Sequence, residues 1–391
     1  MAKPRSALVQ LDVGGSLSGV SNAMVGQARA AAETDTLLDV IIVNNSRDGI
    51  ERGVRYVRHP PIPKLLRRVS RLVKARLLAS VLPELDAYDV VFLRYPTAID
   101  LDPLRYVRRS RSRVVTVHHS KDEHQALAES RSPGMLLRAG VEYVQGRRVL
   151  RHVDGVVGVT DEIRDYHLAR AGRTLPARTI ANGVDVRSVP ITGFVPYDGR
   201  ELRLVLVSSN HWTWHGDDRL LSALRSYRGS RRIVVDMVGQ GSGEVGSEER
   251  LGPNVTIHHH GLLHGAALDE VMRRANVGIS TLAFFRSGLR QAAVLKTREY
   301  IARGLPVVFG YEDVDVPDDS PFVLRVPSND NPLAIDDVFA FAERVSKERD
   351  LVPTMRSFAE RVLDWRVKVP LFAKFADEIL ASPLRNGAPS S

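Results

Sequence analysis

The strongest constraint on the fold of this chain is a repeated alternation of short apolar segments with helix-compatible ones. In the first half, "DVIIVNN", "DVVFLRY" and "RVVTVHH" are almost continuously apolar, and each is followed by a helical or loop stretch. Such strands are typical of parallel sheets covered by helices on both faces, because neither side of the strand meets water. The first half is therefore predicted to be a doubly wound α/β domain.

The same alternation starts again after a stretch without periodicity. The segment Val186–Glu201 contains two prolines and two glycines and predicts an interdomain linker. Beyond it, "LRLVLVSS", "RRIVVDMVG" and "LPVVFG" repeat the strand pattern. We expect two Rossmann-like domains, residues 1–190 and 200–365, and a C-terminal helix within 366–391 that returns to the N-terminal domain. The two domains would face each other across a cleft, and ligands of open α/β sheets bind at the carboxyl ends of the strands.

Composition narrows the possible chemistry. The 391 residues include no cysteine, which excludes a thiolate metal site and a cysteine nucleophile. With 55 Lys and Arg against 46 Asp and Glu, the net charge of +9 favours anionic partners. No stretch reaches the roughly 18 apolar residues of a membrane-spanning helix, and the N-terminus lacks the pattern of a signal peptide. We therefore expect a cytoplasmic protein.

One strongly basic amphipathic segment lies in the first half. "KLLRRVSRLVKAR", Lys64–Arg76, carries six basic residues and no acidic one, and its apolar residues recur at helical spacing. Two interpretations fit it equally: peripheral docking on anionic lipid at the inner face of the plasma membrane, or an ordinary solvated face of a packed helix. Nucleic acid is not an expected partner, because the basic residues lack interleaved aromatic ones and no nucleic-acid motif is present.

Two glycine-rich loops follow strands. "GGSLSG" contains Gly14 and Gly15, and "VGQGSGE" contains Gly239 and Gly241. Glycines let backbone N–H groups approach a ligand closely, although neither spacing is the GxGxxG of dinucleotide-binding proteins. At the first loop, phosphate or acceptor binding and an ordinary turn are equally compatible with the sequence.

Histidines and tryptophans stand at other strand ends. His118 and His119 end "RVVTVHH", and because strand side chains alternate, at most one of them points toward a ligand. Trp214 and His215 lie just before a predicted helix. For the strand-end histidines the alternative is a structural hydrogen-bonding role, and for the loop with Trp214 and His215 it is a hydrophobic staple onto the helix. The run His258–His260 alternates along a strand and cannot converge on one metal, so no metal site is expected.

The stretch "QAAVLKTREYIARGLPVVFG" gathers charges on one short helix before a buried strand. Lys296 lies in the first turn of that helix, where a cation opposes the helix dipole unless an anion is present. A diphosphate would resolve this conflict, and Glu299, one turn further, could accept two hydrogen bonds from a ribose diol. The alternative for Glu299 is an ordinary surface pair with Arg303, four residues later.

Together these motifs resemble glycosyltransferase family 4, which has the GT-B fold. "RHVDGVVGVTDEI", "LRLVLVSSNHWTWHGDDRLL", "VVDMVGQGSGE" and "GLRQAAVLKTREYIARGLPVV" carry the resemblance between Val153 and Phe309, and the first half resembles the family more loosely. The resemblance implies a retaining transfer of a sugar from a nucleotide diphosphate sugar, UDP- or GDP-linked, to a hydroxyl of a sugar, lipid-linked sugar or other glycan. It further implies a role in the synthesis of cell-surface polysaccharide or glycoconjugates, with no cofactor or metal.

The resemblance also implies residue roles. Glu299 would hold the donor ribose, Lys296 and Arg286 would neutralise the diphosphate, and His118 would face the transferred sugar. The other residues that it places at the donor or acceptor are Gly14, Gly15, Trp214, Gly239, Gly241 and Gly288.

Three positions depart from the family's pattern. Gln291 stands where many members carry a glutamate, and an amide cannot take a proton. Asn210 and His215 stand where the loop after the second domain's first strand usually carries Arg and Lys. These departures leave open two alternatives: a sugar-nucleotide epimerase of the same fold and a non-catalytic sugar-nucleotide-binding protein.

Overall fold

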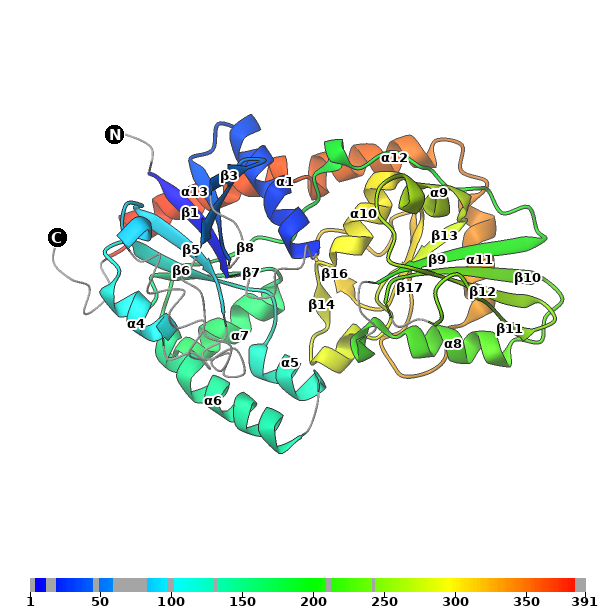
Figure 1. The fold of residues 1–391 in the computed structure, drawn as a ribbon, viewed down its shortest axis with the longest axis horizontal. Helices are drawn as coiled ribbons and strands as arrows, with labels where there is room; N and C mark the ends of the chain where they lie inside the picture. The colour runs from blue at the N-terminus through cyan, green and yellow to red at the C-terminus, as the bar shows by residue number, and fades with distance from the viewer. Residues whose placement is uncertain are drawn as a thin grey trace. The chain divides into compact units, whose positions relative to one another are not determined.

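The structure is a computed structural model, and it forms two compact units, each with its own sheet (Figure 1). It describes residues 4–11, 19–44, 49–58, 83–96, 102–129, 132–208, 212–240 and 243–383. Unit 1 comprises residues 1–185 and 365–391, and unit 2 comprises residues 186–364. Both units contain a mostly parallel sheet covered by helices, which confirms the predicted α/β class.

The described strands of unit 1 form an eight-stranded sheet in the order β3-β4-β2-β1-β5-β6-β7-β8. They are β1 (Ser6–Leu11), β2 (Leu38–Asn44), β3 (Gly49–Glu51), β4 (Val54–Arg58), β5 (Val90–Arg94), β6 (Arg113–His118), β7 (Gly155–Gly158) and β8 (Ala177–Thr179). Neighbouring strands pair in parallel, except that β3 and β4 pair antiparallel. The strand order reverses between β1 and β5, which makes that point the topological switch point of this sheet.

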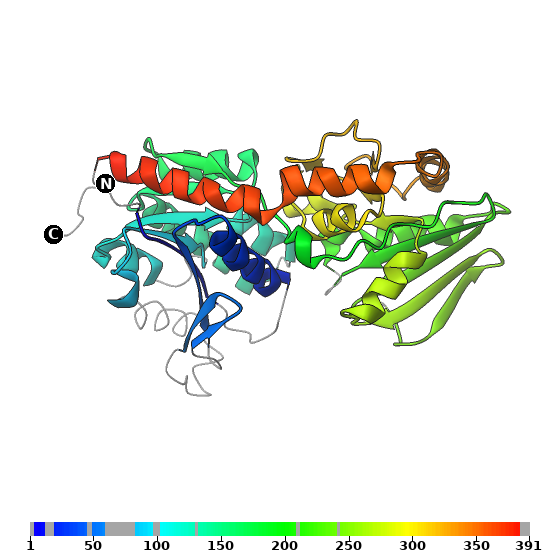
Figure 2. The ribbon, with the colours of Figure 1, turned by 90° about the horizontal axis from the view of Figure 1, so that it is seen from above.

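Helices cover both faces of this sheet, and the last one comes from the C-terminal part of the chain. They are α1 (Gly19–Glu33), α4 (Asp102–Arg109), α5 (Asp122–Glu129), α6 (Pro133–Leu150), α7 (Asp161–Ala171) and α13 (Trp365–Ala381). Figures 1 and 2 show α13 beside α1, where a Cβ on Gly26 would lie 2.8 Å from the Trp365 ring. The buried residues of α13 recur every three or four positions, and Phe372 contacts Phe92 of β5 with ring centroids 5.1 Å apart. This stripe makes α13 part of the core of unit 1.

The described strands of unit 2 form a seven-stranded sheet in the order β11-β12-β10-β9-β13-β15-β17. They are β9 (Glu201–Val207), β10 (Arg232–Val238), β11 (Glu248–Gly252), β12 (Val255–Gly261), β13 (Val277–Ile279), β15 (Val307–Phe309) and β17 (Val323–Arg325), while β14 (Gln291–Ala292) and β16 (Glu312–Asp313) pair separately. Among the described strands of this sheet, β11 pairs antiparallel with β12 and the other neighbours pair in parallel. The order reverses between β9 and β13, so the switch point of unit 2 lies there.

The helical elements of unit 2 follow the strands as expected for a doubly wound sheet. They are η1 (Val186–Ser188), η2 (Thr213–His215), α8 (Asp217–Ser226), α9 (Ala266–Arg274), η3 (Phe284–Ser287), α10 (Leu295–Arg303), α11 (Ile335–Val345), α12 (Leu351–Phe358) and the π-helical turn η4 (Ala359–Leu363). In the part of the chain that the structure describes, no helix is both long enough and apolar enough to span a bilayer.

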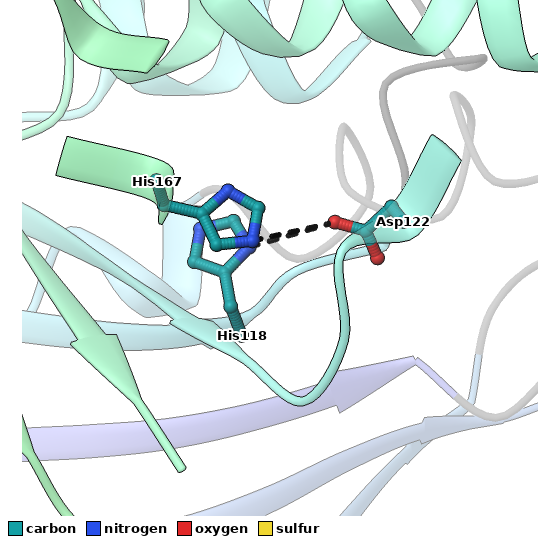
Figure 3. A group of neighbouring side chains, drawn as sticks. All are labelled: His118, Asp122 and His167. Atoms are coloured by element: carbon teal, nitrogen blue, oxygen red, sulfur yellow. Dashed lines mark ion pairs between the residues drawn. The ribbon is translucent and has the colours of Figure 1, made fainter. Parts of the chain in front are cut away.

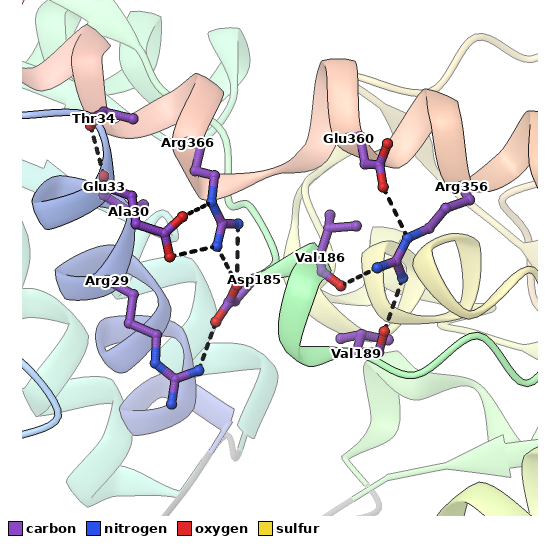
Figure 4. A network of polar contacts seen from close by, with 10 residues as sticks. All are labelled: Arg29, Ala30, Glu33, Thr34, Asp185, Val186, Val189, Arg356, Glu360 and Arg366. Carbon is purple, nitrogen blue, oxygen red and sulfur yellow. Dashed lines mark hydrogen bonds and ion pairs between the residues drawn. The ribbon is translucent and has the colours of Figure 1, made fainter.

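The chain leaves unit 1 after Asp185 and re-enters it at Trp365, and each crossing is anchored within its own unit (Figure 4). On the unit 1 side, the Asp185 carboxylate accepts hydrogen bonds from Arg29 at 2.9 Å and Arg366 at 3.2 Å. On the unit 2 side, Arg356 donates to the carbonyl oxygens of Val186 at 2.8 Å and Val189 at 2.9 Å. Both crossing points are therefore fixed by charge-assisted hydrogen bonds, which are the stronger kind.

Candidate functional site

The switch point of unit 2 brings two loops together at the carboxyl edge of its sheet. One loop follows β9 and the other follows β13, and the amide of Leu282 in the second donates to the carbonyl of His215 in the first at 2.7 Å. The His215 ring is fixed by a contact of 2.7 Å between its Nδ1 and Ser208 Oγ. Gly216 has φ 74°, and a Cβ there would lie 2.8 Å from the Ala283 nitrogen, so the close approach of the loops requires glycine.

Helix α10 starts from this edge, and its first turn is tied to the sheet by buried hydroxyls. Thr297 Oγ1 lies 2.7 Å from Ser280 Oγ and 2.5 Å from the Tyr311 hydroxyl. The amide of Val207, the last residue of β9, donates to the Tyr300 hydroxyl at 3.0 Å. These contacts fix the N-terminus of α10 beside the switch point, where its free N–H groups favour an anion.

Lys296 lies in this first turn, as predicted, and its ammonium nitrogen is buried. Among the described residues, Nζ has no hydrogen-bond partner. Burial lowers the pKa of Lys296 to about 8, while the Asp217 carboxylate opposes that shift. A buried cation without a hydrogen-bond partner is unfavourable. The arrangement therefore suits an anionic ligand.

The other charges of α10 do have partners. Arg298 is fully buried and donates to Asp313 at 2.8 Å and Asp315 at 3.1 Å, so it is a structural residue. Glu299 accepts from Arg303 at 2.9 Å, and Arg303 also reaches Asp269 at 2.6 Å. The surface-pair alternative for Glu299 is thus formed, although about a third of its side chain stays exposed.

Arg286, expected at the diphosphate, is occupied by neighbouring carboxylates. It donates to Asp218 at 2.8 Å and to the Thr213 carbonyl at 2.8 Å, and it lies 2.6 Å from Asp330. Its hydrogen bonds with Asp218 raise the pKa of Arg286. Because two carboxylates already offset its charge, Arg286 would have to leave at least one of them to bind a phosphate.

Several remaining candidates line the same edge. A Cβ on Gly239, which has φ 144°, would lie 1.6 Å from the Ser208 carbonyl oxygen, so only glycine fits. Gly288 ends η3 with φ 78°. The rings of Trp212 and Trp214 stack with centroids 5.1 Å apart and an angle of 7°. Gln291 lies in β14, paired with Glu312 of β16.

Some predicted features lie outside the described residues. These are Gly14, Gly15, Asn210, Gly241 and the basic segment Lys64–Arg76.

In unit 1, His118 belongs to a buried polar cluster that sequence reasoning did not assemble (Figure 3). Its ring stacks on His167 with centroids 3.6 Å apart, and its Nδ1 lies 3.6 Å from Asp122 Oδ2. Burial and the charge of Arg170 hold the pKa of His118 well below its usual value, and burial also lowers the pKa of His167 and raises that of Asp122. The two rings are therefore neutral at physiological pH.

This cluster has the residue types of a metal site, but its hydrogen bonding argues against one. Ligand atoms of His118, Asp122 and His167 lie within 4.8 Å of one another. However, His167 Nε2 lies 2.9 Å from the Ser120 carbonyl, which can only accept a hydrogen bond, so this nitrogen carries a proton and cannot coordinate a metal. We interpret the cluster as a structural one that orients His118.

Two comparisons with known protein sequences gave different results. The family model described as Glycosyltransferase Family 4 matches residues 17–188, which is mostly the half that resembles the family more loosely by its motifs. Comparison with curated protein sequences gave no match.

Solved structures with a similar fold cover nearly the whole chain. Sucrose-phosphate synthase from Thermosynechococcus elongatus is 17% identical with a TM-score of 0.65, and the similarity covers 97% of this chain and 100% of that one. The Anabaena protein HepE, solved with UDP-glucose, is 15% identical with a TM-score of 0.61 and the same coverage. A glycosyltransferase from Rickettsia africae is 14% identical with a TM-score of 0.60, again with 97% and 100% coverage. Over residues 17–188 the chain is thus similar to glycosyltransferase family 4, and the similarity to these solved structures shows that it has the GT-B fold.

Proposed function

We propose that this protein is a retaining glycosyltransferase that moves a sugar from a UDP- or GDP-sugar to a hydroxyl of a sugar, lipid-linked sugar or other glycan. In this proposal residues 200–365 bind the donor and residues 1–190 bind the acceptor. HepE, a protein of similar fold, was solved with UDP-glucose, which supports a nucleotide-sugar donor. The product would belong to cell-surface polysaccharide or glycoconjugate synthesis.

The observation that carries the proposal is the buried ammonium of Lys296 at the N-terminus of α10. The helix N-terminus and the ammonium both favour negative charge, and both lie at the switch point where α/β sheets bind ligands. A donor diphosphate would supply the partner that Nζ lacks among the described residues. Negative charge grows on that diphosphate as the sugar leaves, so Lys296 would stabilise the transition state more than the ground state.

The remaining roles follow from this placement of the diphosphate. Glu299 would exchange part of its contact with Arg303 for hydrogen bonds to the donor ribose. Gly239 and Gly241 would let backbone N–H groups approach the base or ribose, and Gln291 would hydrogen-bond the sugar hydroxyls. These roles are consistent with the loops that meet at the edge of unit 2.

The proposed chemistry is substitution on one face of the donor sugar. The bond from the anomeric carbon to the phosphate oxygen breaks, the acceptor oxygen bonds to the same face, and its proton passes to the leaving phosphate. His118 would face the transferred sugar, and the neutral state of its ring suits hydrogen bonding rather than charge stabilisation. The protein then acts chiefly by positioning and by stabilising the leaving group.

The test is a donor panel followed by a transfer assay. UDP-, GDP-, ADP- and dTDP-sugars are screened by thermal shift, because a ligand that binds the folded state raises its stability by mass action. The donor that binds is then incubated, radiolabelled, with and without glycan acceptors. We expect transfer with retained anomeric configuration. An inverted product would contradict the retaining assignment, and no binding by any nucleotide sugar would contradict the proposal as a whole.

Gln291 favours a second candidate, a sugar-nucleotide epimerase of the same fold, because the family glutamate is missing at this position. The same labelled donor distinguishes the two functions: an epimerase converts it to another sugar nucleotide without an acceptor. A donor that binds but does not react would instead indicate the non-catalytic binding protein.

The basic segment Lys64–Arg76 motivates a separate proposal, peripheral binding to the cytoplasmic face of the membrane, where a lipid-linked acceptor is met. Co-sedimentation with vesicles of anionic and of neutral lipid tests it. We expect binding to the anionic vesicles that is lost at high salt, and no binding at low salt would contradict the proposal.

A further inference from the structure

Unit 1 contains a narrow cavity that the candidate site does not use. Its walls come from β1 and β5, on the two sides of the switch point, from the residue after β6, and from helices α1 and α13. The residues that line it are Leu8, Met24, Gln27, Arg94, Val117, His119, Val159, Ile180, Asn182, Trp365 and Phe372. None of these is acidic, and Arg94 carries the one permanent positive charge among them.

Arg94 is the last residue of β5 and is held in this cavity without a partner. Among the residues that the structure describes, its guanidinium makes no hydrogen bond or ion pair, whereas Arg113, on the neighbouring strand β6, pairs with Asp154 at 3.0 Å. Burial lowers the pKa of Arg94 to about 10, so the group remains charged at neutral pH. The side chain is only partly buried, and an anion bound in the cavity would supply the counter-charge that it lacks among the described residues.

Two further polar groups of the cavity lack a partner and, unlike the Arg94 guanidinium, are buried away from water. His119 Nδ1 and Gln27 Oε1 are buried and have no hydrogen-bond partner within the described residues. Burial and the charge of Arg94 hold the pKa of His119 well below its usual value. A neutral imidazole can carry its proton on Nδ1, and a 180° rotation of the Gln27 amide would turn its NH2 group inward. Arg94, His119 and Gln27, from three separate elements, can therefore all donate into one space.

We propose that this cavity binds the anionic group of a ligand, a phosphate or a carboxylate, with Arg94 as its counter-charge and His119 and Gln27 as additional donors. A guanidinium fork matches both anions, because each offers two oxygens in one plane. If the proposed function holds, the anion belongs to the acceptor, which would then be a phosphorylated or carboxylated sugar or polyol. That last step rests on the proposed function, whereas the anion site itself rests only on the geometry of unit 1.

The first experiment measures anion binding by the full-length protein. Inorganic phosphate and acetate are titrated by calorimetry at constant ionic strength against the wild type, Arg94→Met, Arg105→Met and Lys296→Ala. Arg105 is an exposed arginine of unit 1 and controls for the loss of one positive charge from a basic surface. Lys296→Ala removes the cation of the candidate donor site.

We expect Arg94→Met to weaken binding of at least one of the two anions about tenfold or more, while Arg105→Met stays within about twofold of wild type. Lys296→Ala reports any anion binding at the donor site, and it should keep the binding that Arg94→Met loses. Without added anion, Arg94→Met should melt no lower than wild type, because it removes an uncompensated charge. Wild-type affinity in Arg94→Met, a lower melting temperature of that variant without anion, or no binding by the wild type would each overturn the proposal.

The second experiment does not depend on how well a variant folds. The pKa of His119 is followed in the wild type by NMR of labelled imidazoles, with His119→Gln to assign the signal. A bound anion favours the protonated ring, so whichever anion binds should raise the pKa of His119. An unchanged pKa at an anion concentration that saturates the calorimetric signal would place the bound ion elsewhere and overturn the proposal.

A third measurement tests the link to the acceptor. Glucose 6-phosphate, glucuronate and glucose are compared as acceptors with the donor that the panel identifies, for wild type and Arg94→Met. We expect the variant to raise KM for an anionic acceptor and to leave the affinity for the donor unchanged. Transfer to glucose alone, unaffected by the variant, would overturn the acceptor assignment. If no donor reacts at all, the proposed function fails, while the binding and NMR results still decide the anion site.

Discussion

The carboxyl edges of the two sheets each carry a cation without a hydrogen-bond partner among the described residues, but the two cations differ in kind. Arg94 lines a cavity with no acidic residue in its lining, and its pKa of about 10 keeps it charged at physiological pH. Lys296 lies at a helix N-terminus with the Asp217 carboxylate nearby, and its pKa of about 8 lets it lose its proton in mildly alkaline solution. The same topology thus provides a permanent charge in unit 1 and a titratable one in unit 2.

A third cation shows what distinguishes a structural charge from a candidate for ligand binding. Arg298 lies only two residues after Lys296, is fully buried and has two carboxylate partners, Asp313 and Asp315. Burial alone therefore does not mark a site. The absence of a hydrogen-bonded partner does, because the hydrogen bonds lost on burial are recovered only when a ligand binds.

Arg298→Met should have the largest effect on stability. It leaves Asp313 buried without its partner, and losing one member of a buried ion pair costs about 3–5 kcal/mol. Urea denaturation measures the free energy of unfolding. Arg349→Met, at an exposed arginine of the same unit, is the control and should change stability by no more than about 0.5 kcal/mol. If Arg298→Met lowers the free energy of unfolding by less than about 1 kcal/mol, Arg298 is not the structural charge that distinguishes it from Lys296.

Lys296→Ala should reduce turnover more than about 100-fold, since it removes charge stabilisation of the leaving diphosphate. The matched control is Lys347→Ala, at an exposed lysine of unit 2, which should keep wild-type kcat. Steady-state kinetics with the identified donor give both values. A reduction of less than about threefold would exclude Lys296 from the mechanism.

The pH dependence of donor binding should follow the titration of Lys296. The diphosphate needs the protonated ammonium, so affinity for the free nucleotide diphosphate should be nearly constant up to about pH 8 and then fall about tenfold per pH unit. Calorimetry at pH 7, 8 and 9 measures this fall. The variant Lys296→Arg keeps its positive charge over this pH range, so its affinity should no longer depend on pH. Equal slopes in both proteins would assign the titration to another group.

Glu299→Ala should have the smallest effect on stability. Its pair with Arg303 is partly exposed, and Arg303 keeps its ion pair with Asp269. The free energy of unfolding should therefore change by only a few tenths of a kcal/mol. Donor affinity should nevertheless fall about tenfold or more, because hydrogen bonds from a ribose to a carboxylate are charge-assisted. Glu343→Ala, at another ion-paired glutamate of unit 2, controls for the loss of a surface pair. If both variants bind the donor equally well, Glu299 is only a surface pair.

The inner strands of both sheets follow directly from the sequence, whereas the edge strands do not. β5 and β10 are apolar runs, but the edge strands β3 and β11 are the segments "GIE" and "EERLG", and β4, which lies next to β3, is "VRYVR". An edge strand has one side in water and needs no continuous apolar run, so it is recognised only from its pairing partner. The strand pattern therefore predicted the parallel core of each sheet and omitted its antiparallel margin.

The candidate site shows the same division. The position of Lys296 in the first turn of a helix at a sheet edge was readable from the sequence, and so was the possible pair of Glu299 with Arg303. The partners of Arg298 and Arg286 were not, because Asp313, Asp218 and Asp330 come from other loops. Strand alternation indicated that His118 and His119 face different surroundings, but only the packing shows that His118 stacks on His167 while His119 lines the cavity.

The sequence by itself determined the α/β class, the inner strands and the helix that carries Lys296, because these depend on local periodicity and on the order of residues along the chain. Only the tertiary structure decided which of the cations acquire counter-ions. Pairing depends on which distant carboxylates arrive within about 4 Å, a distance that local sequence does not encode. Arg94 illustrates this: it ends an unremarkable apolar strand, and its lack of a partner became visible only when the walls of the cavity were assembled.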